Sequence, residues 1–279
     1  MPERDPRPRI LGLTSTLPRW AGDTTPPFVL DLCRELAREF EVHALAPHAA
    51  GARSREDMDG VAVHRFRYLP VAWQTLAYAG GIPERLHRRP LALFQVPFFL
   101  IAQFCAALFL TWLLRPKLIH AHWVIPQGLL ALVISRLSPG RPAVICTLHG
   151  SDVHGWNAGP WRWLKSLALR RADLVTTVSD HLRALIVALG VSPRRVHVAP
   201  MGVDTAGAFR PNTEGSGPRS GAVFVGRLMA GKGVDVLLRA WAQLPAGPDA
   251  AQLIVVGDGH ERRALQAQAI SLGLGDRVR

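Results

Sequence analysis

Residues 10–47 have the sequence ILGLTSTLPRWAGDTTPPFVLDLCRELAREFEVHALAP, in which two short apolar runs flank a helix-like segment. The apolar runs, 10–15 and 41–47, have the length and composition of buried strands. Thr24 and Thr25 suit a helix cap, and the two prolines after them suit a first turn. Apolar residues then recur at helical spacing, at Val29, Leu32, Cys33, Leu36 and Phe40. A strand, a helix and a second strand in this order predict parallel strands joined by a crossover.

The same alternation continues through the first 203 residues. Ser179 is predicted to cap a helix that ends near Gly190 and has an apolar face. Further strand-like runs lie at 61–66, 118–122, 143–148, 174–178 and 196–199. Seven strands that alternate with helices predict a mainly parallel sheet covered on both faces, which is a doubly wound α/β domain.

A second, smaller unit follows a change in composition. Residues 205–221 are rich in Gly, Pro and Ser, and they predict a linker between a first domain of residues 1–204 and a partial domain of residues 222–279. The partial domain repeats the strand–helix alternation, with strand-like runs at 222–226 and 252–256 and helix-like runs at 232–244 and 260–273.

Two parallel strands form a sheet that is too small to cover its own apolar residues. We expect residues 276–279 to turn into a further strand after the helix stop at Gly273 and Gly275. We also expect four strand residues to have few neighbours, namely Val223, Val225, Ile254 and Val256. The second unit is therefore expected to be incomplete in this chain and marginally stable by itself.

The charge balance narrows the class of partner. The chain has 33 basic and 21 acidic residues, a formal net charge of +12, and its basic residues form no run longer than a pair. No zinc-finger, basic-zipper or RNA-recognition signature accompanies them, so we expect no nucleic-acid partner. Phosphate-bearing ligands or a membrane surface fit this charge better. The three cysteines lack a C-x-x-C pair and the N-terminus lacks a signal-peptide core, which predicts a cytoplasmic protein.

One segment has the composition of a membrane helix. Residues 91–114 contain no charged residue over 24 positions, which is long enough to span a bilayer. Pro97 and Gln103 weaken that interpretation, as does the position of the segment directly before a predicted strand. The sequence favours a crossover helix that is buried or touches a membrane. A true span and a segment that docks on lipid without crossing stay open as alternatives.

Several loops follow predicted strands at the edge where open parallel sheets bind ligands. Residues 18–25 lead into a helix N-terminus and suit an anion, with an ordinary capped turn as the alternative. His120 and His122 share one strand face, but zinc would need a third ligand, so a packed or substrate-touching pair is favoured. In HGSD, His149 can bond a hydroxyl, and Asp152 has the alternative role of a cap.

The second unit has two glycine-rich loops. Residues 226–233 place Arg227 and Lys232 on a loop that enters a helix, which suits a diphosphate. The loop is not a P-loop, because Gly233 follows Lys232 in place of Ser or Thr. In the second loop, GDGHER, a dinucleotide fingerprint would require glycine at Arg262, so a nicotinamide enzyme is disfavoured.

Taken in order, these motifs resemble the family-4 (group 1) retaining glycosyltransferases of the GT-B fold, which have two facing Rossmann-like domains. The matching motifs are FRYL (66–69), HAHWVIPQG (120–128), HGSD (149–152), PMGVD (200–204), VGRLMAGKG (225–233) and VGDGHE (256–261). The resemblance implies transfer of a sugar from a nucleotide-sugar donor to a hydroxyl with retention of configuration. It also implies that neither a metal nor another cofactor is required.

The resemblance also assigns roles to residues. Arg227 and Lys232 would hold the donor diphosphate, and His149 would contact the donor sugar. Gly22 would lie near the donor phosphates or the acceptor, although the chain has Ala21-Gly22 where many members have two glycines. The remaining positions divide between the nucleotide (Gly226, Gly257, Asp258, Gly259 and Glu261) and the acceptor (His122 and Asp152). The family's pair of glutamates separated by seven residues has no counterpart before Arg279.

The expected function is therefore sugar transfer in cell-envelope polysaccharide or glycolipid synthesis, incomplete in the chain as given. The basic first domain and its apolar helix favour a lipid-linked or saccharide acceptor and peripheral contact with the inner face of a membrane. The alternative is a non-catalytic, membrane-associated or binding remnant of the same fold.

Overall fold

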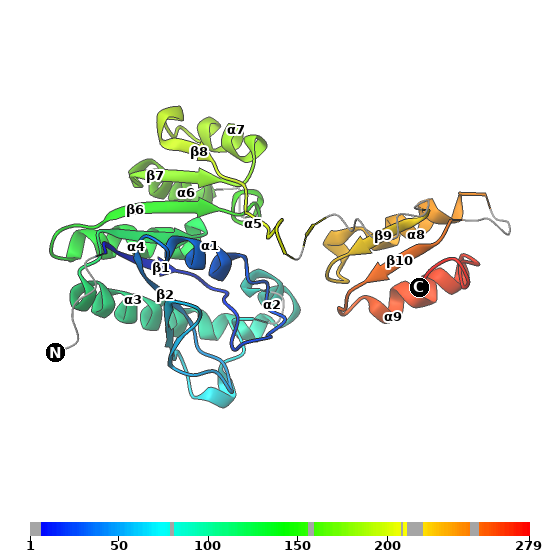
Figure 1. The fold of residues 1–279 in the computed structure, drawn as a ribbon, viewed down its shortest axis with the longest axis horizontal. Coiled ribbons are helices and arrows are strands. Elements are labelled where there is room, and N and C mark those ends of the chain that lie inside the picture. The colour runs from blue at the N-terminus through cyan, green and yellow to red at the C-terminus, as the bar shows by residue number, and fades with distance from the viewer. Residues whose placement is uncertain (1–6, 79–80, 156–158, 208, 211–219, 246–250) are drawn as a thin grey trace. The chain divides into compact units, whose positions relative to one another are not determined.

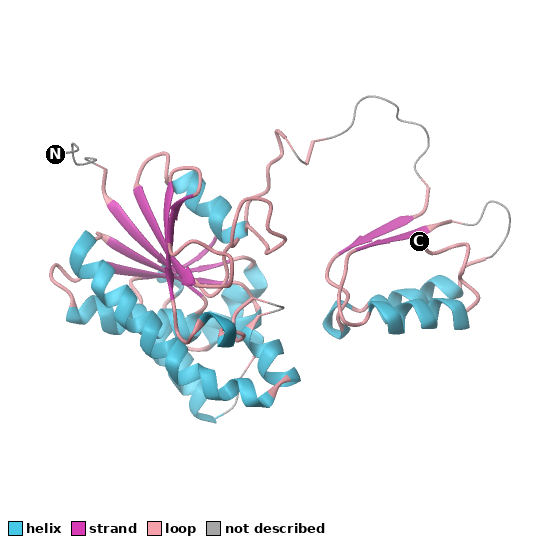
Figure 2. Cartoon of the chain, turned by 90° about the horizontal axis from the view of Figure 1, so that it is seen from below, coloured by secondary structure: helices cyan, strands magenta, loops and turns pink. Residues whose placement is uncertain are grey.

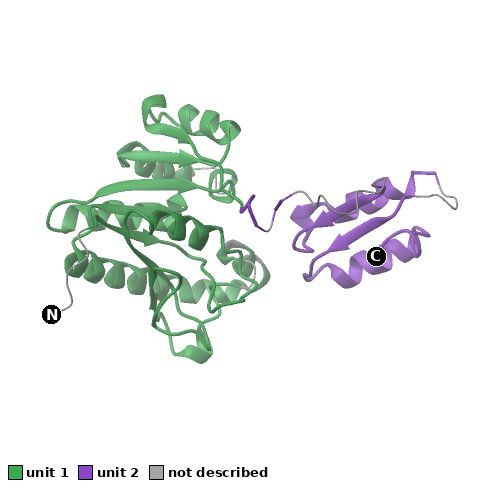
Figure 3. Ribbon diagram, viewed as in Figure 1, with its two compact units in different colours: residues 1–203 green, residues 204–279 purple. Residues whose placement is uncertain are grey.

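A computed structural model describes residues 7–78, 81–155, 159–207, 209–210, 220–245 and 251–279. The chain divides into two compact units, Met1–Val203 and Asp204–Arg279, which are described separately (Figure 3). Most of the predicted linker, residues 211–219, lies outside the described residues.

Unit 1 is built on an eight-stranded sheet with the order β3-β4-β2-β1-β5-β6-β7-β8 (Figure 1). Every neighbouring pair is parallel except β3 with β4. The strand order reverses between β1 and β5, which is where open α/β sheets bind ligands. The strands are β1 (Arg9–Leu13), β2 (Glu41–Pro47), β3 (Arg55–Asp57), β4 (Val61–Phe66), β5 (Leu118–His122), β6 (Ala143–Leu148), β7 (Leu174–Thr177) and β8 (Val196–Val198).

Helices cover the sheet unequally, and Figure 2 shows most helices of unit 1 on one face. Val29, Leu30 and Cys33 of α1 pack with Val42 and Val63 in one core cluster. A larger cluster on the other face contains side chains from α3, α4, α6 and α7. The helices of this unit are α1 (Phe28–Leu36), α2 (Ile82–Arg88), α3 (Gln95–Leu114), α4 (Leu129–Leu137), α5 (Ser151–His154), α6 (Gly159–Arg171) and α7 (Asp180–Ala188).

The doubly wound α/β architecture and all seven predicted strands are confirmed. Ser179 caps α7 as predicted, since its hydroxyl accepts the Leu182 N–H at 3.3 Å. The predicted threonine cap of α1 is wrong. That helix begins after Pro27 and has no side-chain cap bond, because the two prolines separate Thr24 and Thr25 from its first amides. The uncharged segment 91–114 forms the 3₁₀ turn η2 (Pro90–Phe94) and α3, the crossover from β4 to β5.

Unit 2 is a two-stranded parallel sheet with both helices on one face, as Figure 2 shows. Its elements are β9 (Ala222–Val225), α8 (Val234–Ala242), β10 (Leu253–Val256) and α9 (Arg262–Ser271). The core contains Leu228, Leu238, Trp241, Leu253 and Leu265.

The opposite face of the small sheet carries the four residues predicted to have few neighbours. Val223, Val225, Ile254 and Val256 are between 46 % and 73 % exposed. The last residues of the chain continue the sheet, since the Val255 N–H donates to the Arg279 carbonyl at 2.7 Å and the Arg279 N–H to the Leu253 carbonyl at 3.0 Å. Residues 276–279 therefore turn onto β10 as predicted, and Val278 forms an isolated parallel bridge with Leu253 in place of a full strand.

Candidate functional site

Three loops of unit 1 meet at the carboxyl ends of the central strands. The register aligns Leu13 of β1 with Ala121 of β5, and His122 of β5 with Thr147 of β6. The loops that follow β1, β5 and β6 consequently start side by side at the point where the strand order reverses. This edge carries the polar residues that the sequence singled out in the first unit.

A stack of three imidazoles lies at this edge, made of His120, His122 and His149, and is called the histidine stack below. The rings of His120 and His122 are 4.4 Å apart between centroids, and those of His122 and His149 are 5.4 Å apart. His122 Nδ1 lies 3.2 Å from His149 Nε2. His120 Nε2 lies 2.6 Å from the Thr147 hydroxyl, which lies 2.6 Å from the hydroxyl of Thr176. The sequence identified the His pair but not the two threonines that extend it across the sheet.

Burial keeps the histidine stack neutral at physiological pH. Removal from water lowers the pKa of His120 and of His149 to about 4. The pKa of His122 is lowered well below its usual value, first by burial and then by the two neighbouring rings. A neutral imidazole has one donor and one acceptor nitrogen, so His122 and His149 can share a hydrogen bond between Nδ1 and Nε2. His149 lies at the end of the stack and packs against the rings of Phe28 and Trp123.

Asp152 fixes the loop that presents His149. One of its oxygens accepts the backbone N–H groups of His149 and Gly150 at 3.2 and 3.1 Å, and the other accepts the N–H of Val124 at 3.3 Å. Burial raises the pKa of this carboxyl group, and the three amides act against the rise. This is the capping role that the sequence left open. A contact between Asp152 and an acceptor stays a prediction.

Lys165 of α6 also holds this loop, through its backbone carbonyls. Its ammonium donates to the carbonyls of Asp152 and Val153 at 2.9 and 3.2 Å, and also to the carbonyl of Gly155. The chain has only three lysines, and this one is 2 % exposed within a helix. An amphipathic pattern alone does not distinguish a buried lysine from a solvated one, so the sequence analysis did not identify it.

The loop after β1 is braced by ion pairs. The Asp23 carboxylate accepts two bonds from the Arg19 guanidinium, at 2.9 and 2.7 Å, which hold the pKa of Asp23 well below its usual range. Arg65 of β4 is buried and donates to the Pro18 carbonyl at 2.9 Å. Gly22 has a φ of +79°, with no atom within 4 Å of the position of a Cβ. The backbone at Gly22 is thus open enough for a ligand to approach, and its assigned role stays a prediction.

In unit 2, the loops of residues 226–233 and 257–261 form one structure, called the two-loop platform below. The Gly226 N–H donates to Val256 O at 3.0 Å and the Leu228 N–H to Asp258 O at 2.9 Å. A Cβ on Gly257 would lie 1.9 Å from Gly226 O, and one on Gly259 would lie 2.1 Å from Leu228 O. Only glycine fits at these two positions, because the neighbouring backbone occupies the space of a side chain.

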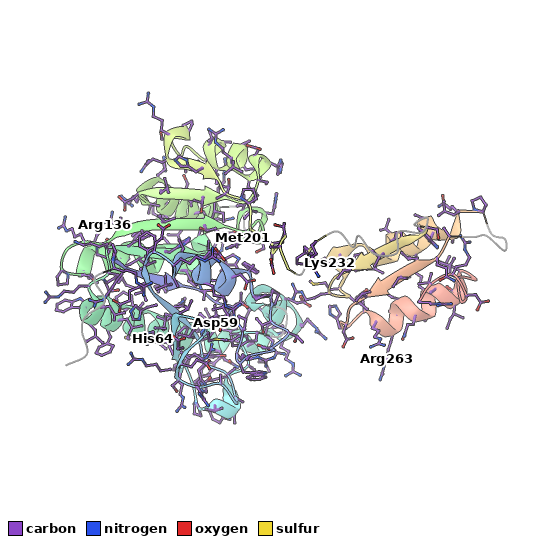
Figure 4. All side chains as sticks on the ribbon, in the orientation of Figure 1. Asp59, His64, Arg136, Met201, Lys232 and Arg263 are labelled. Atoms are coloured by element: carbon purple, nitrogen blue, oxygen red, sulfur yellow. The ribbon has the colours of Figure 1, made fainter. Side chains whose placement is uncertain are left out.

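The two-loop platform presents the predicted cations. Arg227 and Lys232 are both exposed, and Lys232 lies in the short 3₁₀ turn η5 (Ala230–Lys232) directly before α8 (Figure 4). The Glu261 N–H donates to Leu228 O at 3.2 Å, which ties the start of α9 to the first loop. The roles predicted for Gly226, Gly257, Asp258, Gly259 and Glu261 thus fall on residues that lie together, whereas their contacts with a nucleotide stay predictions.

Among the described residues, no group of three or more His, Cys, Asp or Glu side chains has the arrangement of a metal site. The independence of the reaction from metals and other cofactors stays a prediction.

Comparison with known families identifies the chain. Residues 25–202 match the family described as Glycosyl transferase 4-like domain, and residues 211–279 match Glycosyl transferases group 1. The chain belongs to this glycosyltransferase family. The resemblance stated from its motifs is confirmed, and the family's order of domains agrees with the order of the two units.

Curated relatives are similar over about half of the chain. A GDP-mannose-dependent alpha-(1-6)-phosphatidylinositol monomannoside mannosyltransferase from Mycolicibacterium smegmatis is 34 % identical over 167 residues, covering 55 % of this chain and 42 % of the relative. A putative teichuronic acid biosynthesis glycosyltransferase, TuaC, from Bacillus subtilis is 35 % identical over 165 residues, covering 54 % and 40 %. The chain thus aligns with less than half the length of these relatives.

Solved structures are similar in fold. Anabaena Alr3699/HepE in complex with UDP-glucose has a TM-score of 0.61 at 17 % identity, covering 98 % of this chain and 68 % of that one. The catalytic domain of starch synthase IV from Arabidopsis thaliana, bound to ADP and acarbose, has a TM-score of 0.64 at 13 % identity, covering 98 % and 73 %. These similarities confirm the predicted GT-B-like fold class.

Proposed function

We propose that this chain acts in the transfer of a sugar from a nucleotide-sugar donor to an acceptor hydroxyl. The two-loop platform is the observation that supports this proposal most strongly. Its glycines let two loops pack backbone against backbone, and Arg227 and Lys232 stand on that rigid base beside the N-terminus of α8. A guanidinium, an ammonium and helix amides are the groups that bind a diphosphate.

The same cations fit the chemistry of the reaction. As the bond between the sugar and the diphosphate breaks, positive charge grows on the sugar and negative charge on the departing diphosphate. Arg227 and Lys232 would stabilise the negative charge, and each contact of this kind lowers the barrier by about 2–4 kcal/mol. We further propose that the anomeric configuration is retained, as the family resemblance implies, and that no metal is needed.

In this proposal, His149 at the end of the histidine stack contacts the donor sugar. His149 is neutral because of its burial, so it can donate to or accept from a sugar hydroxyl without adding a positive charge beside the developing cation. Asp152 and Lys165 hold its loop, and Phe28 and Trp123 fix its ring. His122 supports His149 from behind through the 3.2 Å contact between their nitrogens.

For the substrates, we propose a nucleoside-diphosphate sugar as donor and a lipid-linked or saccharide acceptor of the cell envelope, used at the cytoplasmic face of a membrane. The printed names of relatives support these classes. Two similar proteins are named for GDP-mannose with a phosphatidylinositol mannoside and for teichuronic acid, and a similar structure holds UDP-glucose.

The test is a transfer assay followed by NMR, with the full chain, GDP-mannose or UDP-glucose, and phosphatidylinositol or a monosaccharide glycoside as acceptor. Because the second unit is expected to be incomplete, we expect slow transfer with an α-linked product from an α-linked donor, and a rate lowered further, by about 100-fold, in Arg227→Ala and in Lys232→Ala. Arg263→Ala removes an exposed cation of α9 and is the matched control. A β-linked product would contradict retention, and equal rates in all three variants would contradict the role of the platform. Donor binding without any transfer would favour the non-catalytic alternative.

A further inference from the structure

We propose that unit 1 docks on an anionic lipid surface through the outer face of α3. That face and the last residue of η2 form a stripe of six residues at intervals of three or four positions, here called the outer stripe, consisting of Phe94, Phe98, Ile101, Cys105, Phe109 and Trp112. All six are exposed, with Phe109 at 65 % and Trp112 at 56 %. A helix on the surface of a globular protein normally has polar residues on its outer face, and the outer stripe has none.

The opposite stripe of the same helix holds it on the protein. Phe99, Gln103, Ala107, Leu110 and Thr111 are buried against the sheet. The Phe99 ring lies 5.1 Å from that of Phe66 and 5.3 Å from that of Tyr68, between centroids. The helix therefore has apolar residues on both faces, but among the described residues of unit 1 only one face has a partner.

This attachment decides between the alternatives that the sequence left open. Among the described residues, Pro90–Leu114 is a helical segment that is long and apolar enough to cross a membrane. Of its most apolar stretch, 22 % is buried in the protein. Crossing a bilayer would require α3 to leave the sheet and expose the core around Phe99. A helix that keeps one face on the protein can lie in the membrane interface and insert the other face among the acyl chains. The structure thus favours docking over spanning.

The charge of the surrounding sequence identifies the kind of lipid. Between Glu84 and Asp173 the only acidic residue is Asp152, whose carboxylate is directed at backbone amides, whereas the same stretch contains 11 Lys and Arg residues. Exposed basic residues stand at both ends of the outer stripe, Arg88 and Arg89 before it and Arg115 and Lys117 after it. Basic residues beside an inserted apolar face attract anionic headgroups.

The helix α4 also exposes apolar and basic residues. The helix α4 contributes to the same core cluster as α3 and exposes Val133, Leu137 and Arg136, the last of which is labelled in Figure 4. A second copy of the chain fits the outer stripe less well. Because both ends of the stripe are basic, two copies would place like charges together whether their helices ran parallel or antiparallel.

The proposal is tested by co-flotation of the full chain with vesicles at low salt. Vesicles are either phosphatidylcholine alone or an equal mixture with phosphatidylglycerol. We expect binding to the anionic vesicles that weakens with added salt. The variant Phe98→Gln/Phe109→Gln/Trp112→Gln should lose at least 10-fold in affinity. The matched control, Val236→Gln/Ile270→Gln, changes exposed apolar residues of α8 and α9 and should bind as the wild type does.

A second variant tests the charge and keeps the experiment decisive if the first one folds poorly. Arg115→Gln/Lys117→Gln should weaken binding about 5-fold for each charge removed, since each basic residue near an anionic surface contributes about a factor of that size. Arg262→Gln/Arg263→Gln is its control. Quenching of tryptophan fluorescence by brominated lipid should fall in Trp112→Phe.

Failure to bind anionic vesicles at low salt would overturn the proposal, as would unchanged binding in both test variants. Dimerisation of the chain in analytical ultracentrifugation that is abolished by the triple variant would assign the outer stripe to a second copy instead. These readouts do not depend on sugar transfer.

Discussion

Lowering the pH should destabilise unit 1 through its histidine stack. An imidazole that is buried and neutral has a lower pKa in the folded than in the unfolded chain, so its stability contribution is present above the unfolded pKa and is lost as the pH falls toward the folded one. For His120 and His149 that window runs from 6.5 down to about 4. When the pH falls from 7.5 to 5.5, each of these two imidazoles should lower the free energy of unfolding by about 1.3 kcal/mol.

The free energy of unfolding is measured by urea denaturation at both pH values, for wild type, His120→Gln and His197→Gln. Glutamine can keep a hydrogen bond to Thr147 but cannot gain a proton, so His120→Gln should lose about 1.3 kcal/mol less than wild type over this interval. His197 is exposed on β8, and His197→Gln is the surface control for a histidine-to-glutamine change.

Other groups also respond to pH, so the comparison is between variants. Burial lowers the pKa of His64 to about 4, which adds to the loss, and burial raises the pKa of Asp152, which acts in the opposite direction. Both contributions are common to the three proteins. An identical pH dependence in wild type and His120→Gln would refute the conclusion that burial keeps this imidazole neutral.

Two further predictions concern the loops that carry the site. Asp152→Ala leaves three backbone amides of its loop without their acceptor, so the free energy of unfolding should fall by about 2–4 kcal/mol in urea denaturation, whereas Asp180→Ala at the exposed start of α7 should cost less than 1 kcal/mol. Gly257→Ala brings a methyl group against the Gly226 carbonyl and should abolish nucleotide binding in calorimetry, whereas Gly275→Ala, with nothing within 4 Å of its Cβ, should bind normally. A free energy of unfolding equal to that of wild type in Asp152→Ala would contradict the geometry described. Nucleotide binding by Gly257→Ala as tight as that of wild type would also contradict it.

Much of the fold could be predicted because its signals are local. Each predicted parallel strand is a short apolar run, and the exposure of Val223 and Val256 follows from counting strands in the second unit. The strand β3 was missed because its three residues, Arg55, Glu56 and Asp57, are all charged, and it is an edge strand that pairs only with β4.

The site was predictable only in part because its decisive contacts join distant residues. The pattern of a strand places His120 and His122 on one face, but nothing in the sequence states that His149, in the loop after β6, stacks on His122. Lys165 and Arg65 are buried cations, and their burial depends on carbonyls that other loops supply. A charged residue that interrupts an otherwise apolar strand or helix face is the signal that could have indicated them.

The most direct measurement is a calorimetric titration of the full chain with GDP and with UDP. The account predicts one-to-one binding of at least one of the two, weakened about 10-fold or more in Arg227→Ala and in Lys232→Ala, because each cation makes a charge-assisted bond to the diphosphate. Arg263→Ala should bind as the wild type does. Absence of binding by either nucleotide, or equal affinity in all of these variants, would contradict the assignment of the two-loop platform as the donor site.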